Sequence, residues 1–388
     1  MCLKSLYYEG LCSIKKEIME NSYYCLLLFA VVFIITFFLI PKIRLVSLKF
    51  NFTDTPGIRS SHVNATPSFG GVAFYISYIF TLFVLQFFYS NQVSLTLLAS
   101  ISVLFFTGIL DDILNISAKL KFLGQFLGVA LLMFQPDFRI LTMHGFMGVY
   151  EIPLPVSVGG SMFFLLGLIN AFNLLDGIDG LTAITGIIVA TFYSFVFYML
   201  GYSYYLCISI TTIATLLAFL RFNFSTKRKI FMGDTGSLSI GLVLGLLTLK
   251  LMTAEDASYL GLNFDQKQLP LLLLGVLFVP ILDTCRVMLI RFFRGVSMFK
   301  PDRNHIHHIV VDYGLSHRKA AIFIGFVNFS VGLIMFFVII NFSALQSAIL
   351  LFVIFAVSIV LLFLINKNKA ALKLKVKIKN SMFRMFCF

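Results

Sequence analysis

The sequence predicts an all-α polytopic membrane protein, and three observations carry that prediction. The chain has 388 residues, of which 59% are hydrophobic and only 12% are charged. A soluble protein of this length cannot bury so much apolar surface. Apolar stretches close to the roughly 20 residues that cross a bilayer recur along the whole chain. The remaining polar residues gather into a few short motifs that interrupt or border these stretches.

We expect about eleven membrane-spanning helices in one transmembrane domain, residues 22–366. The predicted spans are 22–41, 70–90, 93–110, 120–135, 157–175, 181–200, 203–222, 236–253, 269–290, 321–341 and 345–366. The fourth is short for a span. Residues 1–21 form a polar N-terminal segment in which Met19 is an alternative start, and residues 367–388 form a basic tail. The six cysteines are scattered without a CxxC pair, which indicates neither a disulfide framework nor a thiolate metal site.

Charge predicts the orientation of these spans. Lysine and arginine concentrate between spans one and two, after spans three and seven, between spans nine and ten, and in the tail, within a net charge of +13. Acids are more prominent in the alternate connections, such as the loop with Asp137 and Glu151. By the positive-inside rule the basic connections are cytoplasmic. Eleven spans then place the C-terminus in the cytoplasm, where the basic tail would adhere to anionic lipid.

Five polar motifs fall on the predicted cytoplasmic side. They are TPGIRSSHVNATPSFGG (55–71), DD (111–112), NAFNLLDGIDGL (170–181), FMGDTGS (231–237) and PDRNHIHH (301–308). Acids that were merely solvated in loops would have no reason to prefer the basic face. The shared location therefore indicates a functional site at that face.

The acidic pair Asp111 and Asp112 ends a helix that runs from outside to inside. The helix dipole disfavours negative charge at this C-terminus, and the two like charges repel each other. Lys119 and Lys121 would neutralise both acids in a purely structural arrangement. The functional alternative is that a divalent cation, or a proton in transfer, is the missing partner.

In NAFNLLDGIDGL, polar side chains recur every three residues: Asn170, Asn173, Asp176 and Asp179. On a helix this spacing places amides and carboxylates along a single face. Asp179 alone has a simpler alternative, as a cap of the following helix.

Two further motifs carry charge and aromatic rings. Asp234 precedes a span and is either an N-cap or part of an anion or metal site at the helix N-terminus. Phe231 is either interfacial packing or a platform on which a base stacks. The loop with Arg303, His305, His307 and His308 is either a solvated basic loop or a site for phosphate oxygens and sugar hydroxyls. Three histidines could bind zinc, but no fourth ligand follows at a familiar spacing. The oxygen-rich aspartate motifs instead favour magnesium.

Together, the carboxylates, amides and basic residues predict a membrane enzyme that handles phosphates with Mg²⁺. Carboxylates hold Mg²⁺ with few protein ligands when the substrate brings phosphate oxygens. A secondary transporter is the competing class, but transporters place such acids near the bilayer midplane, often in two related repeats. No repeat is visible in this sequence.

The five motifs, in this order over roughly residues 35 to 320, resemble those of the polyprenyl-phosphate N-acetylhexosamine-1-phosphate transferases, glycosyltransferase family 4. PDRNHIHH is similar to the branch that transfers GlcNAc-1-phosphate to undecaprenyl phosphate and begins O-antigen, teichoic-acid or related polysaccharide synthesis. The phospho-MurNAc-pentapeptide translocase branch, or another UDP-N-acetylhexosamine donor, is the alternative. The resemblance implies a bacterial plasma membrane protein with a cytoplasmic active site and UMP as the leaving group. It implies no nucleic-acid partner, and a homodimer is left open.

The resemblance also implies roles for individual residues. Asn173 and Asp234 are the implied Mg²⁺ ligands, with Mn²⁺ as an alternative metal. Asp111, Asp112 and Asp176 are the implied catalytic residues, with Asp111 deprotonating or orienting the lipid phosphate. Whether the reaction is direct or passes through an aspartyl intermediate is left open, although phosphoryl transfer needs mainly positioning and charge neutralisation. The implied substrate contacts are Lys121 (with Lys119 as its alternative), Asp179, Phe231, Arg303, His305, His307 and His308.

Overall fold

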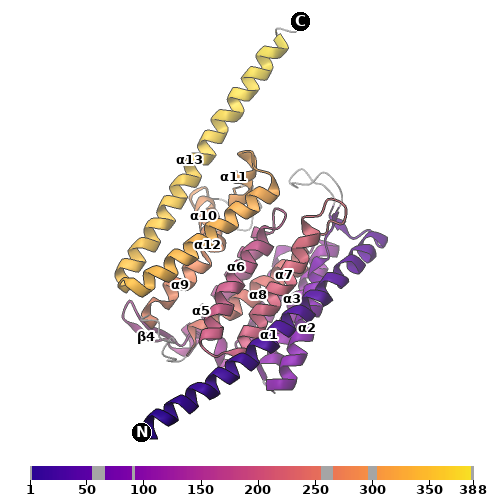
Figure 1. Ribbon diagram of the computed structural model, residues 1–388. Helices are drawn as coiled ribbons and strands as arrows, with labels where there is room; N and C mark the ends of the chain where they lie inside the picture. Colours follow the sequence, from indigo (N-terminus) through magenta and orange to yellow (C-terminus); the bar gives the residue numbers. More distant parts are fainter. Residues whose placement is uncertain (1, 55–65, 90–91, 255–264, 296–303, 386–388) are drawn as a thin grey trace.

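The computed structural model of the chain describes residues 2–54, 66–89, 92–254, 265–295 and 304–385. The residues that it describes form thirteen α-helices and two small antiparallel sheets, so the all-α prediction is confirmed (Figure 1). The helices are α1 (Cys2–Lys49), α2 (Gly70–Tyr89), α3 (Gln92–Leu114), α4 (Ala118–Leu132), α5 (Leu154–Leu175), α6 (Leu181–Met199), α7 (Ser203–Asn223), α8 (Gly233–Met252), α9 (Leu269–Val276), α10 (Phe278–Phe293), α11 (Ile306–Asp312), α12 (His317–Asn341) and α13 (Ala344–Met385). Strand β1 (Thr53–Asp54) pairs with β2 (Thr66–Pro67), and β3 (Thr142–Phe146) pairs with β4 (Val149–Glu151).

The eleven predicted spans become nine long helices, one bent pair and one short helix within the described ranges. Nine helices are long and apolar enough to cross a membrane, and α9 with α10 adds a tenth, bent by 74°. The predicted span 269–290 is therefore a broken one. The predicted span 120–135 is α4, which has 15 residues and would be only about 22 Å long. The predicted span 120–135 still follows α3 from end to start: Lys121 contacts Asp111 near the end of α3, and Gln135, three residues beyond α4, donates to Thr96 near the start of α3.

Helix α8 forms the centre of the bundle. Of its membrane-crossing segment, 94% is buried, and it packs against α5, α3 and α2. Glycines allow this close packing. A Cβ on Gly71 of α2 would lie 2.2 Å from the backbone nitrogen of Gly236, and one on Gly108 of α3 would lie 2.5 Å from the Cα of Thr235. The start of α8 is therefore held tightly between α2 and α3.

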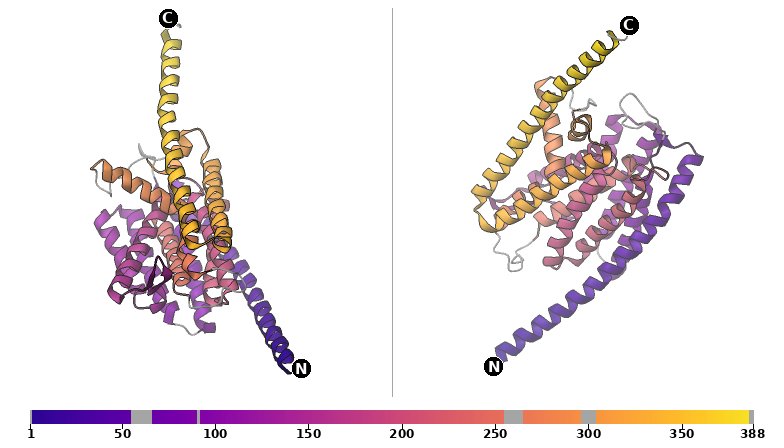
Figure 2. Two further views of the ribbon diagram at one scale, coloured as in Figure 1. Left: turned by 90° about the vertical axis from the view of Figure 1, so that its left-hand side faces the viewer. Right: turned by 45° about the horizontal axis from the view of Figure 1, so that its top comes forward.

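The last helix has a different environment. Only 6% of the membrane-crossing part of α13 is buried, so its apolar side chains face outward, where lipid would cover them. Figures 1 and 2 show that α13 and α1 extend past the bundle at opposite ends, which places the two termini on opposite sides.

A polar cluster near the β3–β4 hairpin marks one end of the bundle. Asp137 accepts a hydrogen bond from Tyr205 at 2.7 Å and pairs with Lys250 at 3.1 Å. Tyr205 lies near the start of α7 and Lys250 near the end of α8. The hairpin was not predicted from the sequence, and it turns through Met147 and Gly148, both at positive φ. The polar motifs described next lie at the other ends of α3, α5 and α8.

Candidate active site

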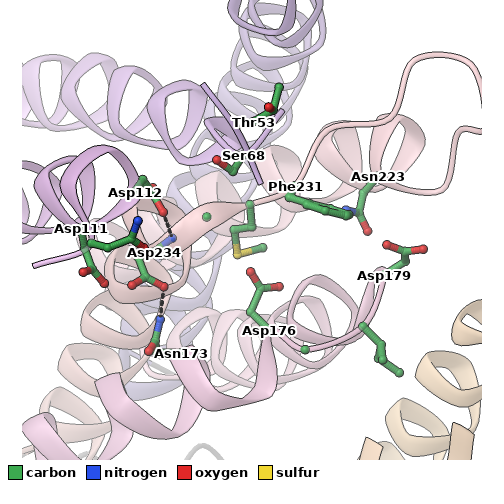
Figure 3. A pocket seen from close by; sticks show the side chains of 15 residues that line it. Thr53, Ser68, Asp111, Asp112, Asn173, Asp176, Asp179, Asn223, Phe231 and Asp234 are labelled. Carbon is green, nitrogen blue, oxygen red and sulfur yellow. Dashed lines mark hydrogen bonds between the residues drawn. The ribbon is translucent and has the colours of Figure 1, made fainter. Parts of the chain in front are cut away.

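Four of the five predicted motifs contribute side chains to one cavity of about 330 Å³, whereas the described residues of the histidine motif do not line it. The ends of α3 and α5, the start of α8 and the β1 and β2 region enclose it (Figure 3). The residues that line it are Thr53, Ser68, Asp111, Asp112, Asn115, Asn173, Asp176, Gly177, Ile178, Asp179, Asn223, Phe231, Met232, Gly233 and Asp234. Five of these carry carboxylates. The lining is thus rich in acidic side chains, and the ammonium groups of Lys121 and Lys229 pair with three of them.

Lys121 joins three helices at one end of this cavity. Its ammonium lies 2.9 Å from Oδ2 of Asp111 and 3.3 Å from Oδ1 of Asn173, and it also contacts Oδ2 of Asp234. The side chain of Lys121 is only 18% exposed. Lys119, the alternative considered from the sequence, is exposed. The geometry therefore favours Lys121 as the cation of this cluster.

Asn173 is oriented by two hydrogen bonds. Its Nδ2 donates to Oδ1 of Asp234 at 2.7 Å and to Oγ of Ser237 at 2.9 Å. This leaves Oδ1 facing the ammonium of Lys121. An amide oxygen and two carboxylate oxygens, from Asp111 and Asp234, thus converge on one positive charge.

Asp112 is engaged differently from its neighbour. Its Oδ1 accepts from the backbone N–H of Asp234 at 2.8 Å, and its Oδ2 accepts from the N–H and the hydroxyl of Thr235 at 3.1 and 2.6 Å. These are among the N–H groups at a helix start that have no partner within the helix. Asp112 therefore caps α8 from outside, and the cap fixes the direction of Asp234. Asp234 itself lies in the first turn of α8 and is not its N-cap, which is Met232.

The second acidic motif extends past the end of its helix, which lies where the predicted span 157–175 ends. Helix α5 ends at Leu175, Asp176 is its C-cap, and Asp179 lies in the turn that follows. The expectation that all four polar residues share one helical face is therefore wrong. Asn170 is turned to Gln125, to which its Nδ2 donates at 3.0 Å, and does not line the cavity.

Asp176 lies between the two ends of the cavity in Figure 3. Burial, together with the negative charge of Asp234, raises the pKa of Asp176 to about 7. Near neutral pH this side chain exists in both protonation states. A carboxyl group of this kind is suited to exchanging protons or to binding a cation.

The far end of the cavity is aromatic. Phe231, Asn223 and Asp179 lie together there, away from Asp111 and Asp234 (Figure 3). Lys229 pairs with Asp179 at 2.7 Å and lies 5.1 Å from the centre of the Phe231 ring. Asp179 does not act as the side-chain cap of α6, whose N-cap is Gly180. Lys229 was missed as a site residue because the sequence presented it only as one of several loop cations.

The histidine motif lies against the turn that carries Asp176 and Asp179. A Cβ on Gly177 would lie 2.2 Å from Nε2 of His307, so the imidazole packs directly on this glycine. His307 is 2% exposed, and burial lowers its pKa to about 3. It is therefore neutral at physiological pH. The ring of His308 lies 4.3 Å from that of His307, and Arg303 lies outside the described residues.

His305 has a carboxylate partner that sequence reasoning missed. Its Nδ1 lies 2.9 Å from Oδ2 of Asp283, and Oδ1 of Asp283 accepts the N–H of Ile306 at 2.9 Å. Asp283 is 2% exposed, and Arg286 lies 3.5 Å away. The sequence did offer one signal for this partner, because Asp283 and Arg286 are charged residues within the apolar predicted span 269–290. Asp283 fixes the start of α11 and the orientation of the His305 ring.

In the described part of the chain, no three His, Cys, Asp or Glu side chains form a metal-binding group by themselves. The oxygen donors at Lys121 are two acids and one amide, a set that suits a hard cation whose other ligands come from water or a substrate. The residues at that end of the cavity fit Mg²⁺ on this observation.

Comparison with known proteins identifies the family of the chain. Residues 94–252 match the sequence family "Glycosyl transferase family 4". The chain is 30% identical over 296 residues to a probable undecaprenyl-phosphate N-acetylglucosaminyl 1-phosphate transferase of Bacillus subtilis (strain 168), covering 74% of this chain and 78% of that protein. It is 29% identical over 297 residues to the undecaprenyl-phosphate alpha-N-acetylglucosaminyl 1-phosphate transferase of Salmonella typhi, covering 76% and 78%.

A third relative is similar over a longer stretch. The chain is 29% identical over 336 residues to the decaprenyl-phosphate N-acetylglucosaminephosphotransferase of Mycobacterium tuberculosis (strain CDC 1551 / Oshkosh), covering 78% of this chain and 81% of that protein. The identity of 30% to the Bacillus protein extends over most of both chains. The chain therefore belongs to glycosyl transferase family 4.

Proposed function

We propose that the protein transfers N-acetylglucosamine-1-phosphate from UDP-GlcNAc to undecaprenyl phosphate and releases UMP. The observation that carries this proposal is the cavity itself. Five carboxylates line it, the ammonium of Lys121 lies at one end, and the ring of Phe231 lies at the other. The names of the relatives support the lipid and the sugar phosphate. The reaction would be an early membrane step in cell-surface polysaccharide synthesis.

The bond changes follow from the substrates. An oxygen of the lipid phosphate attacks the β-phosphorus of the nucleotide sugar, and the bond from this phosphorus to the bridging oxygen breaks. That oxygen leaves with UMP, while the sugar-1-phosphate becomes the outer half of a lipid diphosphate. Such a transfer depends mainly on positioning and on neutralising charge. Lys121 and Lys229 supply positive charge at the two ends of the cavity, and Asp112 and Ser237 orient Asp234 and Asn173.

Asp111, Asn173 and Asp234 would hold a Mg²⁺ ion in this scheme, and Mn²⁺ would serve as a substitute. Their oxygens already converge on a cation, the ammonium of Lys121. When bound, the metal neutralises phosphate charge at the reacting end. Phe231 would stack on the uracil ring, with Lys229 beside it and Asp179 close to both. Asp176 lies between these ends, where it would take part in the catalytic network.

The donor's sugar would meet the histidine motif. His307 lies next to the turn of Gly177 with His308 beside it, and a neutral imidazole can hydrogen-bond sugar hydroxyls. We infer GlcNAc rather than MurNAc-pentapeptide from the PDRNHIHH motif and from the three relatives' names. The cavity would face the cytoplasm, where nucleotide sugars are made, because the basic loops flank it.

The test is release of UMP. Purified full-length protein, given UDP-GlcNAc, Mg²⁺ and undecaprenyl phosphate, should form UMP and lipid-linked GlcNAc in equal amounts. Omission of the lipid should stop both. A panel with UDP-GalNAc and UDP-MurNAc-pentapeptide would check the donor. Turnover of the pentapeptide donor with none of UDP-GlcNAc would overturn the donor assignment, and no UMP release with any donor would overturn the reaction.

A further inference from the structure

The ammonium of Lys121 lies where three oxygens from three different helices converge. Asp111 comes from α3, Asn173 from α5 and Asp234 from α8. Lys121 itself comes from the first turn of a fourth helix, α4. The cluster is partly buried, with Lys121 18% exposed, Asp111 16% exposed and Asp234 27% exposed. Ion pairs at such sites are screened less by salt than those on an open surface.

The same three oxygens are those that the proposed function assigns to a divalent cation. Mg²⁺ binds oxygen at about 2.1 Å and requires nearly octahedral geometry. An ammonium that touches all three oxygens occupies the volume in which such an ion would have to lie. Two cations within a few ångströms of each other also repel strongly in a partly buried site. Lys121 and the metal therefore cannot share these ligands in this arrangement.

We infer that Lys121 is an exchangeable counter-ion: it holds the metal site together in the metal-free protein and is displaced when the metal binds. This inference rests on the proposed function, since it takes the same cluster to be the metal site. Without a cation, Asp111, Asp112 and Asp234 would bring three negative charges to one end of the cavity. The lysine offsets this repulsion during folding and before the metal arrives.

Displacement gives the lysine a second position. Lysine has a flexible four-carbon stem, and its ammonium is a compact charge with three donors that can rotate to new acceptors. Once the metal takes the three oxygens, the ammonium is free to meet a phosphate monoester that approaches the same end of the cavity. Metal binding would thus prepare the site for its anionic lipid substrate, and the two cations would act in sequence.

Competition of this kind has a measurable signature in metal affinity. Replacing Lys121 with methionine keeps the length of the stem and removes the competitor. Mn²⁺ binding, followed by loss of the free-ion EPR signal in full-length detergent-purified protein, should become at least about tenfold tighter in Lys121→Met. Lys119→Met is the matched control, because it removes an exposed lysine of the same helix turn that does not touch the cluster. We expect Mn²⁺ affinity of the control to change less than about twofold.

A second measurement reports displacement directly. Brief acetylation with acetic anhydride, read by mass spectrometry, measures how available each amine is. Saturating Mg²⁺ should raise the acetylation rate of Lys121 several-fold relative to that of Lys119. The melting temperature should report the loss of the lysine charge. Metal-free Lys121→Met should melt below the metal-free wild type, and Mn²⁺ should restore its melting temperature.

The outcomes separate this inference from the proposed function. If Mn²⁺ binds the wild type and Asp234→Asn abolishes binding, but Lys121→Met binds no tighter and Lys121 becomes no more reactive, only the exchange is wrong. If Mn²⁺ does not bind to wild type or to Lys121→Met, both the exchange and the metal site are wrong. UMP release, measured separately, then decides whether the transferase reaction survives.

Discussion

The carboxylate of Asp112, at the end of α3, accepts the backbone N–H of Asp234, at the start of α8, over 2.8 Å. Thr235 adds two more hydrogen bonds to the same carboxylate. The adjacent acid, Asp111, is turned the other way, to Lys121. Two neighbouring aspartates therefore have separate roles: Asp111 pairs with Lys121, and Asp112 caps the helix that carries Asp234.

This division predicts a loss of stability when Asp112 is changed. Asp112→Asn keeps the size of the side chain but replaces one acceptor oxygen with an amide NH2 group, which would face an N–H donor of Asp234 or Thr235. A hydrogen bond to a charged group contributes roughly 1.5–3 kcal/mol, so we expect the melting temperature to fall by several degrees and turnover to fall with it. Thermal unfolding of the purified protein, with UMP release alongside it, measures both.

Two matched variants give the control. Thr235→Val removes only the hydroxyl donor and should reproduce part of the stability loss. Asp111→Asn should reduce turnover with a smaller loss of stability, since its oxygen is not part of the cap. An Asp112→Asn protein that melts like the wild type but is inactive would instead assign Asp112 to the chemistry.

Asp234 is expected to bear most of the metal dependence. Asp234→Asn keeps the shape of the side chain and removes one anionic ligand, and metal neutralisation contributes several kcal/mol to such transition states. UMP release should fall by a factor of at least about a thousand, and Mn²⁺ binding should be lost. Ser237→Ala, which removes only the hydroxyl that holds Asn173, should cost about tenfold or less. Near-normal turnover of Asp234→Asn at ordinary Mg²⁺ would exclude this ligand.

The sequence predicts the helices well and the contacts between them poorly. Apolar runs of about 20 residues need a helix to satisfy their backbone in a bilayer, so all-α architecture follows from composition. Motif spacing located Asp111, Asn173 and Asp234, which the structure brings together. It wrongly placed Asp176 and Asp179 on one helical face with Asn170 and Asn173, because both acids lie in the Gly-rich turn that follows the last residue of α5. Lys229 and Asp283 were missed, since their roles exist only through partners 50 and 22 residues away.

The raised pKa of Asp176 predicts a pH-dependent stability in the metal-free protein. The pKa rises from an ordinary 3.8 to about 7 on folding, so the folded state keeps a proton that the unfolded state releases. Stability from this group is present below about pH 4, is lost as the pH rises toward 7, and changes little above that value. Asp176→Asn, which stays neutral, should remove this component. With a chelator present, the melting temperature of the wild type should fall further between pH 5 and pH 8 than that of the variant. Equal falls would show that Asp176 is ionised at both pH values.

The proposed orientation can be tested with tags at two positions. A reporter fused after Phe388 should be cytoplasmic, and one inserted in the 254–268 connection should be outside. Figure 1 shows α13 leaving the bundle at the end where α11 lies, so a cytoplasmic tail would bring the cavity to the same side. A C-terminal reporter found outside would reverse the whole orientation. Two reporters on one side would mean that α9 and α10 together do not cross.

The contact between Gly177 and His307 gives the sharpest local test of the histidine motif. A methyl group at position 177 would lie 2.2 Å from Nε2 of His307, so Gly177→Ala must displace the imidazole or shift the turn of Asp176 and Asp179. Overpacking of this kind costs roughly 1–3 kcal/mol. The KM for UDP-GlcNAc should rise about tenfold or more, while the apparent affinity for the lipid phosphate should change little, since that substrate is expected at Lys121.

The control lies on the same helix that leads into this turn. Gly167 has open space around its Cα, with nothing within 4 Å of an added methyl, so Gly167→Ala should keep normal kinetics. A smaller side chain at position 307 should relieve the clash, so Gly177→Ala combined with His307→Ala should melt above Gly177→Ala alone. It should not regain donor affinity if His307 contacts the sugar. Full recovery of the KM in the double variant would show that His307 only fills space beside Gly177 and that donor recognition lies elsewhere in the motif.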